Sequence, residues 1–520
     1  MSLRAPSIPL PAEATDRLRS VGARPFGLYL HVPFCATRCG YCDFNTYTAG
    51  ELGSSTSPAA WAEAVRRELD AAARLLSPAR PVETIFVGGG TPSLLGAAGL
   101  ADLLGAVRNS FDLAPGAEVT TESNPESTSP EFFDGLRAAG YTRISLGMQS
   151  AAPHVLRILE RRHTPGRALE AAREAAAAGF EHLNLDLIYG TPGETDDDLA
   201  ASLDAVLSVP VDHVSAYALI VEDGTAFARK VRRGEVPMPD DDVLAARYEQ
   251  IDARLSAAGL TWYEVSNWAA AAGSGGFSTR PSASASDRLK GRTQRSVSAS
   301  GRIEGRTRPS TGASDRIEGR TQPSASASDR LERRTQRSVS ASGRIEGRTR
   351  PSAGASGRIE GRTRPSAGAS GLSSPAEPVR SAATSRVEAA PDPDSVCRHN
   401  EAYWRSDDWW GIGPGAHSHV NGVRWWNQKH PATYAASLES GSLPVGGFEI
   451  LTDDDTHTEQ VMLRLRMRSG LPAGELTVDE ADRAERAVSD GLLTRTGGAY
   501  VLTDRGRLLA DGVIRDILVD

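Results

Sequence analysis

The chain has 520 residues and carries 58 Lys and Arg side chains against 66 Asp and Glu, a formal net charge of −8. This length has room for roughly two to four domains; no run of about 18 apolar residues predicts a membrane span, and the N-terminus lacks the apolar segment of a secretory signal. Four cysteines are too few for a disulfide scaffold, and the acidic balance argues against a duplex nucleic-acid partner. We therefore expect a cytoplasmic protein.

Strand-type and helix-type segments alternate over residues 25–270, after an N-terminal tail at 1–24. Six strand–helix units followed by a seventh strand predict a parallel sheet with helices packed outside it. Right-handed crossovers favour a full or partial (β/α) barrel, and doubly wound packing is the alternative. The predicted strands are Leu28–Val32, Thr84–Val87, Glu118–Thr121, Arg143–Leu146, Leu183–Leu187, His213–Leu219 and Thr261–Val265, and the predicted helices include 58–76, 94–109, 153–178 and 241–258.

Residues 271–395 differ in composition from the rest of the chain. They hold 22 basic and 12 acidic side chains, a net charge of +10, which leaves the remaining chain at −18. Repeats of 14 residues, rich in Ser, Arg, Gly and Pro, run from Ser282 to Pro365 with one Leu or Ile residue in each. This pattern is too sparse for a coiled-coil seam. It predicts a disordered basic insertion, for which an acidic partner or an anionic membrane surface is the hypothesis.

Two further units follow the insertion. The block at 396–445 contains five of the eight tryptophans and is predicted to complete the core. The unit at 446–520 combines a helix at 480–490, two strand-type runs around Gly497-Gly498, and a last helix. That order predicts a small winged-helix-like α+β domain. Because the unit has no cationic stripe, we expect it to serve in packing rather than in reading DNA.

Three cysteines lie within eight residues, directly after the first predicted strand, in the motif Cys35-Ala-Thr-Arg-Cys39-Gly-Tyr-Cys42. Thiolates are soft ligands that favour zinc or iron–sulfur. Three of them in one loop can hold three corners of a [4Fe–4S] cluster and leave one iron open for a small molecule. A structural zinc ion would need a fourth protein ligand, for which His31 and the remote Cys397 are candidates. The spacing favours the cluster.

Polar or glycine-rich segments occur at the ends of successive predicted strands. Each alone is typical of a turn, a helix cap or a satisfied buried side chain. Active groups of a parallel barrel gather where the strands end, so we expect these segments to lie together beside the cysteine loop. They are Gly88–Thr91, Glu122 with Asn124-Pro125, Gly147–Ser150, Asn184 with Asp186, and Gly190–Gly193.

These motifs resemble those of the radical S-adenosylmethionine (SAM) superfamily, in which three cysteines bind a [4Fe–4S] cluster and its open iron binds SAM. A closer resemblance, to the oxygen-independent coproporphyrinogen oxidase-like group, rests on LYLHVPFC, CGYCDFN, ISLGMQS, NLDLIYGTPGET and CRHNEAYWRSDDWWGIGPGAHS. It covers about residues 24–270 and 396–520. The resemblance implies a partial (β/α)6-type radical SAM barrel, with Cys35, Cys39 and Cys42 as cluster ligands. It also implies SAM contacts at the matching positions Tyr29, Tyr41, Gly89, Gly90, Thr91, Glu122, Gln149, Arg161 and Asp186.

Within this group the chain resembles the haem-chaperone branch, HemW. Coproporphyrinogen dehydrogenases carry a further cysteine two residues after the triplet, where this chain has Phe44. The chaperone branch instead has CxYCDF and HNxxYW motifs, and this chain has both. Imidazole is a common axial haem ligand, and aromatic rings offer a flat surface to a macrocycle. The resemblance therefore implies haem or porphyrin contacts at His399, Asn400, Tyr403 and Trp404.

The function implied is a haem chaperone that binds haem, a [4Fe–4S] cluster and SAM. It would deliver haem to haemoproteins such as membrane respiratory enzymes. The alternative is an oxygen-independent coproporphyrinogen III dehydrogenase, which converts propionate side chains to vinyl groups through a deoxyadenosyl radical. Departures from the family pattern at Gly40, Glu160 and Thr191 change no ligand type. The large departure is the insertion, whose closure costs only about 2 kcal/mol more than that of a short loop.

Overall fold

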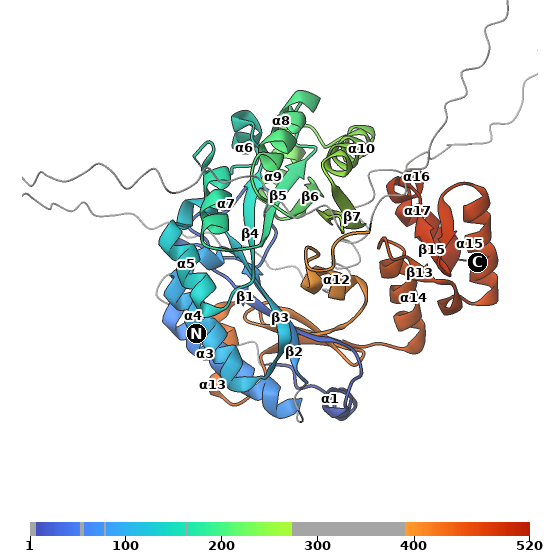
Figure 1. Cartoon of the computed structure of the whole chain (residues 1–520). Helices are drawn as coiled ribbons and strands as arrows, with labels where there is room; N and C mark the ends of the chain where they lie inside the picture. The colour runs from blue at the N-terminus through green and yellow to red at the C-terminus, as the bar shows by residue number, and fades with distance from the viewer. Residues whose placement is uncertain are drawn as a thin grey trace, which may run out of the picture.

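The computed structural model describes residues 7–52, 57–76, 78, 80–162, 164–272 and 390–519 (Figure 1). The predicted disordered insertion therefore falls almost wholly outside the described residues. Its two flanks lie side by side, because Ala271 and Pro391 form an isolated antiparallel bridge. The amide of Ala272 also donates to the carbonyl of Ala390 at 2.8 Å. The chain thus leaves and re-enters the fold at one place, which spares the surrounding sheet.

One large sheet organises the described chain, with strand order β12-β11-β10-β9-β1-β2-β3-β4-β5-β6-β8-β7. The strands from β9 to β6 in this order are parallel, and those at both edges are antiparallel. The parallel strands are β1 (Phe26–Val32), β2 (Val82–Gly89), β3 (Leu113–Ser123), β4 (Arg143–Gln149), β5 (His182–Tyr189), β6 (His213–Ala218) and β9 (Asp408–Ile412). The others are β7 (Leu260–Glu264), β8 (Asn267–Ala270), β10 (His417–Val420), β11 (Val423–Asn427) and β12 (Val445–Ile450). This is the partial barrel with a parallel sheet that the sequence predicts.

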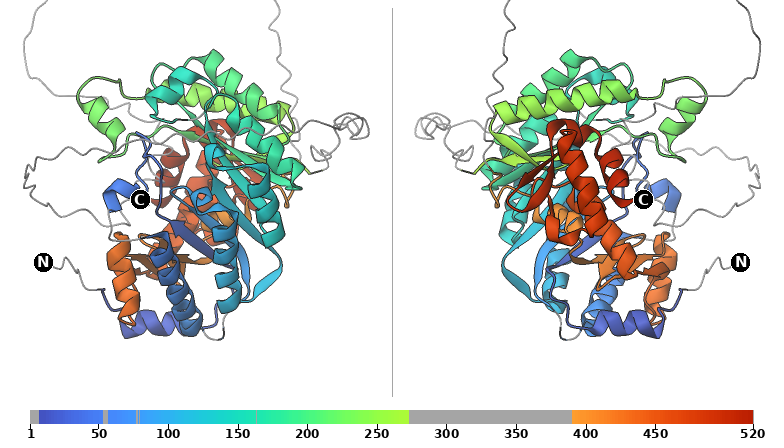
Figure 2. Two further views of the ribbon diagram at one scale, coloured as in Figure 1. Left: turned by 90° about the vertical axis from the view of Figure 1, so that its left-hand side faces the viewer. Right: turned by 90° about the vertical axis from the view of Figure 1, so that its right-hand side faces the viewer.

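Helices cover the outer side of the curved sheet, while α12 (Arg398–Trp404) lies within its curve (Figures 1 and 2). Several helices begin at a side-chain cap: Ser57, Ser129, Thr195 and Asp240 each accept a hydrogen bond from the backbone of the first turn. The helices up to α13 are α1 (Ala12–Arg19), α2 (Ala49–Leu52), α3 (Pro58–Leu75), α4 (Gly96–Ser110), α5 (Pro130–Ala139), α6 (Pro153–Ile158), α7 (Arg167–Ala177), α8 (Asp196–Leu207), α9 (Ala226–Arg232), α10 (Asp241–Ala257) and α13 (Pro431–Glu439), with 3-10 turns η1 (Pro92–Leu95) and η2 (Pro125–Ser127).

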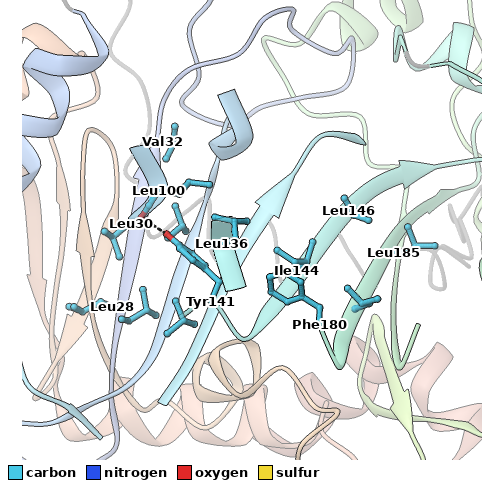
Figure 3. Packing of buried hydrophobic residues seen from close by; sticks show 14 of the residues in the cluster. Leu28, Leu30, Val32, Leu100, Leu136, Tyr141, Ile144, Leu146, Phe180 and Leu185 are labelled. Carbon is cyan, nitrogen blue, oxygen red and sulfur yellow. Dashed lines mark hydrogen bonds between the residues drawn. The ribbon is translucent and has the colours of Figure 1, made fainter. Parts of the chain in front are cut away.

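The main hydrophobic core lies between the outer face of the sheet and these helices (Figure 3). Alternate residues of β1, namely Leu28, Leu30 and Val32, are fully buried there. The hydroxyl of Tyr141 reaches across this layer and donates to the carbonyl of Leu100 at 2.9 Å. Because side chains of a strand alternate between its faces, the intervening residues point into the barrel, where the polar groups are found.

Two local predictions were wrong. The helix predicted over 153–178 is two helices, α6 and α7, because Pro165 and Gly166 interrupt it, Gly166 with φ +83°. The strand predicted at Thr261–Val265 is present as β7 but pairs antiparallel with β8, at the sheet edge. The loop between α6 and α7 carries Arg161, one of the predicted SAM contacts.

The last described residues form a three-stranded antiparallel sheet, order β13-β15-β14, packed with helices. Gly497 and Gly498, with φ +61° and +85°, turn the hairpin between β14 and β15. This agrees with the predicted winged-helix-like arrangement. Its elements are α14 (Asp453–Arg464), β13 (Leu471–Pro472), η5 (Ala473–Glu475), α15 (Val478–Ser489), β14 (Leu493–Thr496), β15 (Ala499–Leu502), α16 (Asp504–Leu508) and α17 (Ala510–Leu518).

Arg507 joins this C-terminal unit to the barrel. Its guanidinium donates to both carboxylate oxygens of Asp252 on α10, at 3.0 and 2.6 Å, and lies 4.6 Å from the ring centroid of Trp262 on β7. We expect Arg507→Met to lower the free energy of unfolding by about 3 kcal/mol, because it leaves a largely buried carboxylate without its cation. Urea denaturation measures the loss. Arg505→Met, at an exposed neighbouring position, is the control, and an equal effect of both changes would contradict this role.

Across the described ranges, we find no helix that combines the length and the apolar character required to cross a membrane.

Candidate cofactor and ligand site

The two ends of the cysteine loop are hydrogen-bonded to each other directly after β1. The amide of Cys35 donates to the carbonyl of Tyr47 at 3.0 Å, and the amide of Tyr47 donates to Pro33 at 2.7 Å. The three thiols are partly exposed. The hydroxyl of Thr91 lies 3.7 Å from the sulfur of Cys35, and the guanidinium of Arg161 lies 3.7 Å from that of Cys39. Donors aimed at two sulfurs suit thiolate ligands.

Burial of the loop favours the neutral form of two of its thiols, those of Cys35 and Cys42. It raises the pKa of Cys42 to about 11 and raises that of Cys35 as well. A bound metal ion removes the proton of a coordinating thiol. The loop therefore suits iron binding coupled to proton release.

The segment Gly88–Thr91 lies directly against the cysteine loop. The amide of Gly90 donates to Val32 at 2.7 Å and that of Thr91 donates to Phe34 at 2.8 Å. A Cβ atom at position 90 would lie 2.5 Å from the carbonyl oxygen of Phe34, so only glycine fits between the two strands. This position agrees with the expectation that the segment lies beside the cysteine loop.

Two adjoining cavities open at the carboxyl ends of the parallel strands. The smaller, of about 160 Å³, is lined by the three cysteines and Gly89, Gly90, Thr91 and Arg161. The larger, of about 500 Å³, is lined by Tyr29, Phe86, Arg143, Asn400 and Tyr403 among others. Tyr41, Phe44, Glu122, Gln149 and Asp186 line both. All nine residues that the resemblance assigns to SAM thus lie on the walls of these two cavities.

Two carboxyl groups, Glu122 and Asp186, lie where the cavities meet. Burial and the neighbouring Asp186 raise the pKa of Glu122 to about 8, although its Oε2 accepts a hydrogen bond from the amide of Gly89 at 2.9 Å. Burial also raises the pKa of Asp186, whose oxygens accept from Asn184 at 2.6 Å and from Ser145 at 3.2 Å. Such a pair favours a cationic or hydroxyl-bearing ligand, which would allow both groups to ionise.

Sequence reasoning missed a set of polar residues that continue inward along the same strands. They occupy alternate positions on neighbouring strands, so they share the inner face of the sheet. Alternation of polar with aliphatic residues inside strands that are otherwise buried was the signal that could have revealed them. They are Glu118 and Thr120 on β3, Arg143 and Ser145 on β4, and His213 and Ser215 on β6, and they adjoin Asn184 on β5, which is predicted from the sequence.

The HNxxYW motif forms α12 inside the barrel, and only part of it reaches the cavity. Asn400 and Tyr403 line the larger cavity. His399 is 1% exposed; its Nδ1 lies 2.8 Å from the hydroxyl of Thr84 and its Nε2 lies 2.9 Å from the hydroxyl of Tyr403. Burial lowers the pKa of His399 to about 4. Trp404 hydrogen-bonds the buried carboxylate of Glu264 instead of lining the cavity.

The tryptophans beyond the motif pack mainly into the protein. Trp410 and Trp425 are fully buried and meet edge to face with their ring centroids 4.7 Å apart. They join β9 to β11 rather than presenting a flat surface to a ligand. The aromatic wall of the larger cavity comes from Tyr29, Phe86 and Tyr403 instead.

The two candidates for a fourth zinc ligand have other partners. Both ring nitrogens of His31 are engaged, with the hydroxyl of Tyr29 at 3.0 Å and the carbonyl of Asn45 at 2.9 Å. The thiol of Cys397 donates to Glu118 at 3.6 Å. Within the described ranges, no group of three His, Cys, Asp or Glu side chains converges tightly enough to hold a single metal ion. The partly exposed thiols beside an open cavity fit a [4Fe–4S] cluster, which spreads its ligands over several irons.

Phe44, at the position where a further cysteine would distinguish the dehydrogenases, lies at the mouth of both cavities. Its side chain is 44% exposed, which is unusual for a large apolar residue. Phe44 therefore presents an apolar surface, and no further thiol, to a ligand that enters either cavity.

Comparisons with known proteins agree with this architecture. Residues 29–206 match the Radical SAM superfamily, and residues 451–509 match the HemN C-terminal domain. The chain is 47% identical over 502 residues to a protein named heme chaperone HemW from Mycobacterium tuberculosis (strain ATCC 25618 / H37Rv), which covers 96% of this chain and 97% of that protein. It is 36% identical over 246 residues to heme chaperone HemW from Escherichia coli (strain K12), covering 47% of this chain and 63% of that one.

A solved structure shares the whole architecture. Coproporphyrinogen III oxidase (HemN) from Escherichia coli, described as a radical SAM enzyme, superimposes with a TM-score of 0.63 over 97% of this chain and 92% of that one. Sequence identity between the two is 18%, so the likeness shows a common fold.

Proposed function

Because the chain belongs to the HemW family of the radical SAM superfamily, we propose that it is a haem chaperone. In this proposal it binds a [4Fe–4S] cluster, SAM and haem, and hands haem to recipient haemoproteins such as membrane respiratory enzymes from the cytoplasmic side. The observation that carries the proposal is a ligand-sized cavity with aromatic walls that adjoins the three cysteines. Clefts of about 300–1,000 Å³ are typical of small-molecule sites.

The proposed roles follow from which cavity each residue lines. Cys35, Cys39 and Cys42 would hold the cluster, with Thr91 and Arg161 donating to its sulfurs. Glu122 and Asp186 suit the ammonium and ribose hydroxyl groups of SAM. When bound together, the cluster and SAM supply one-electron chemistry.

We propose fewer haem-contacting residues than the sequence predicts. Asn400 and Tyr403 line the larger cavity, whereas His399 has both ring nitrogens engaged in the protein. We therefore propose that His399 holds the hydroxyl of Tyr403 in the wall of the larger cavity. Trp404 would anchor α12 through its hydrogen bond to Glu264. Phe44 at the mouth would shield one edge of an apolar macrocycle.

The decisive experiment separates the chaperone from the dehydrogenase. Protein reconstituted with iron and sulfide under anaerobic conditions is titrated with haem, and then mixed with an apo-haemoprotein. We expect a saturable haem complex and transfer of haem to the acceptor. The same protein, reduced and incubated with SAM and coproporphyrinogen III, should form no protoporphyrinogen. Formation of protoporphyrinogen would favour the dehydrogenase, and failure to bind haem would overturn the chaperone proposal.

A further inference from the structure

Two residues on the inner face of the sheet line the larger cavity and carry buried donors without a hydrogen-bond partner. They are Thr120, which is 1% exposed, through its hydroxyl, and Arg143, which is 2% exposed, through Nη1 and through Nε. Thr120 on β3 and Arg143 on β4 are direct register partners in the parallel ladder. They therefore lie side by side and point into the same space.

The rest of the Arg143 side chain is held in place by its surroundings. Its Nη2 donates to the carbonyls of Asp394 and Val396, both at 2.9 Å, in the segment that leads into α12. Its Nε lies 3.4 Å from Glu118. The guanidinium is therefore held in place while Nη1 has no partner, and a buried donor without a partner is unfavourable.

Charge is divided between the two ends of the larger cavity. The carboxyl groups of Glu122 and Asp186 lie at the end that meets the cysteines. At the other end, the oxygens of Glu118 are already occupied by the amides of Arg398 and His399, at 3.0 and 3.1 Å. Arg143 is ion-paired with Glu118 through its Nε, and its Nη1 is the donor left to receive a ligand there, so this end suits a hydrogen-bond acceptor such as a carboxylate.

We propose that Nη1 of Arg143 and the hydroxyl of Thr120 together bind a carboxylate of the ligand in the larger cavity. This inference rests on the proposed function, and it assigns the carboxylate to a propionate of haem. A guanidinium and a hydroxyl that converge on one carboxylate form charge-assisted hydrogen bonds. The aromatic walls formed by Tyr29, Phe86 and Tyr403 lie against the apolar part of the same ligand. The cavity would thereby fix which edge of the macrocycle is turned inward.

The test compares haem with its dimethyl ester, which keeps the macrocycle and iron but has no free carboxylate. Binding is followed by quenching of tryptophan fluorescence in the absence of SAM. We expect the wild-type protein to bind haem about tenfold more tightly than the ester, since one such hydrogen-bonded contact has roughly that effect. Thr120→Val, which keeps the shape of the side chain, should remove most of that preference and leave affinity for the ester unchanged.

The matched control is Thr121→Val, because Thr121 is the next residue of β3, is also buried, and lies on the opposite face of the sheet. It should keep the preference for haem. Since the hydroxyl of Thr120 has no partner in the protein, Thr120→Val should melt at or above the wild-type temperature. A marked loss of thermal stability would assign the hydroxyl a structural role and overturn the proposal.

Two further outcomes would also overturn it. Equal affinity of the wild-type protein for haem and its ester would exclude a propionate site, even though haem still binds. A fall in SAM affinity in Thr120→Val, with the haem preference intact, would assign the pair to the carboxylate of SAM. Failure of the wild-type protein to bind either porphyrin would instead refute the proposed function itself.

Discussion

Cys39→Ser is expected to abolish the visible absorbance of the [4Fe–4S] cluster near 400 nm and the iron and sulfide bound by anaerobically purified protein. Cys39 is the middle ligand of the proposed triplet, and its sulfur lies 3.7 Å from the guanidinium of Arg161. A serine hydroxyl is a hard and poorly ionised donor, whereas iron–sulfur clusters select soft thiolates. Two thiolates on a partly exposed loop are too few to bind the cluster stably. Secondary structure should remain, because the loop is anchored through Cys35 and Tyr47.

Cys397→Ser is the matched control. Cys397 is buried and its thiol donates to Glu118, a contact that a serine hydroxyl can keep. Iron, sulfide and absorbance should therefore match the wild-type values. Loss of metal in this variant, together with zinc in the purified wild-type protein, would favour the zinc site with Cys397 as its fourth ligand. An intact cluster in Cys39→Ser would refute the assignment of the triplet.

The part of the site that could be predicted from sequence is the part that local patterns determine. The cysteine spacing, the glycines that allow two strands to approach, and the polar residues at strand ends are each written within a few neighbouring residues. The carboxyl ends of parallel strands meet at one edge, so the topology then places these segments together. Glu122, Gln149 and Asp186 line both cavities for this reason.

The part that could not be predicted depends on pairing between distant segments. β9 joins β1 across more than 380 residues of sequence, with Phe26 opposite Asp408, and no local pattern indicates such a partner. The same holds for His399, whose ring is occupied by Thr84 and Tyr403 and stacks on Phe86 at 5.4 Å. A histidine in such a motif suggests a haem ligand, but whether its ring is exposed depends on the residues from distant segments that pack against it. The sequence places Arg143 on a strand and indicates no role for it, because the unpaired Nη1 becomes evident only in three dimensions.

Glu122→Gln is expected to change how stability depends on pH in the ligand-free protein. Burial and Asp186 raise the pKa of Glu122 from 4.5 to about 8 in the folded state. Between these two pKa values the unfolded chain releases the proton while the folded chain keeps it. The free energy of unfolding therefore falls as pH rises. It is highest below pH 4.5 and falls as the pH rises to 8. The total fall is no more than about 5 kcal/mol, and it is smaller if water fills the cavity.

A glutamine at position 122 can still accept the hydrogen bond from Gly89 and cannot ionise, so its free energy of unfolding should fall less steeply between pH 5 and 8. Urea unfolding at several pH values measures the two slopes, and Glu63→Gln on the exposed side of α3 should keep the wild-type slope. Equal slopes for Glu122→Gln and wild type would mean that Glu122 is already ionised in the ligand-free protein.

If Glu122 is neutral in the ligand-free protein, a cationic ligand must displace its proton on binding. The affinity for SAM should therefore rise with pH in the wild-type protein and lose that dependence in Glu122→Gln. The proton at this carboxyl would then couple occupancy of the cysteine-lined cavity to pH.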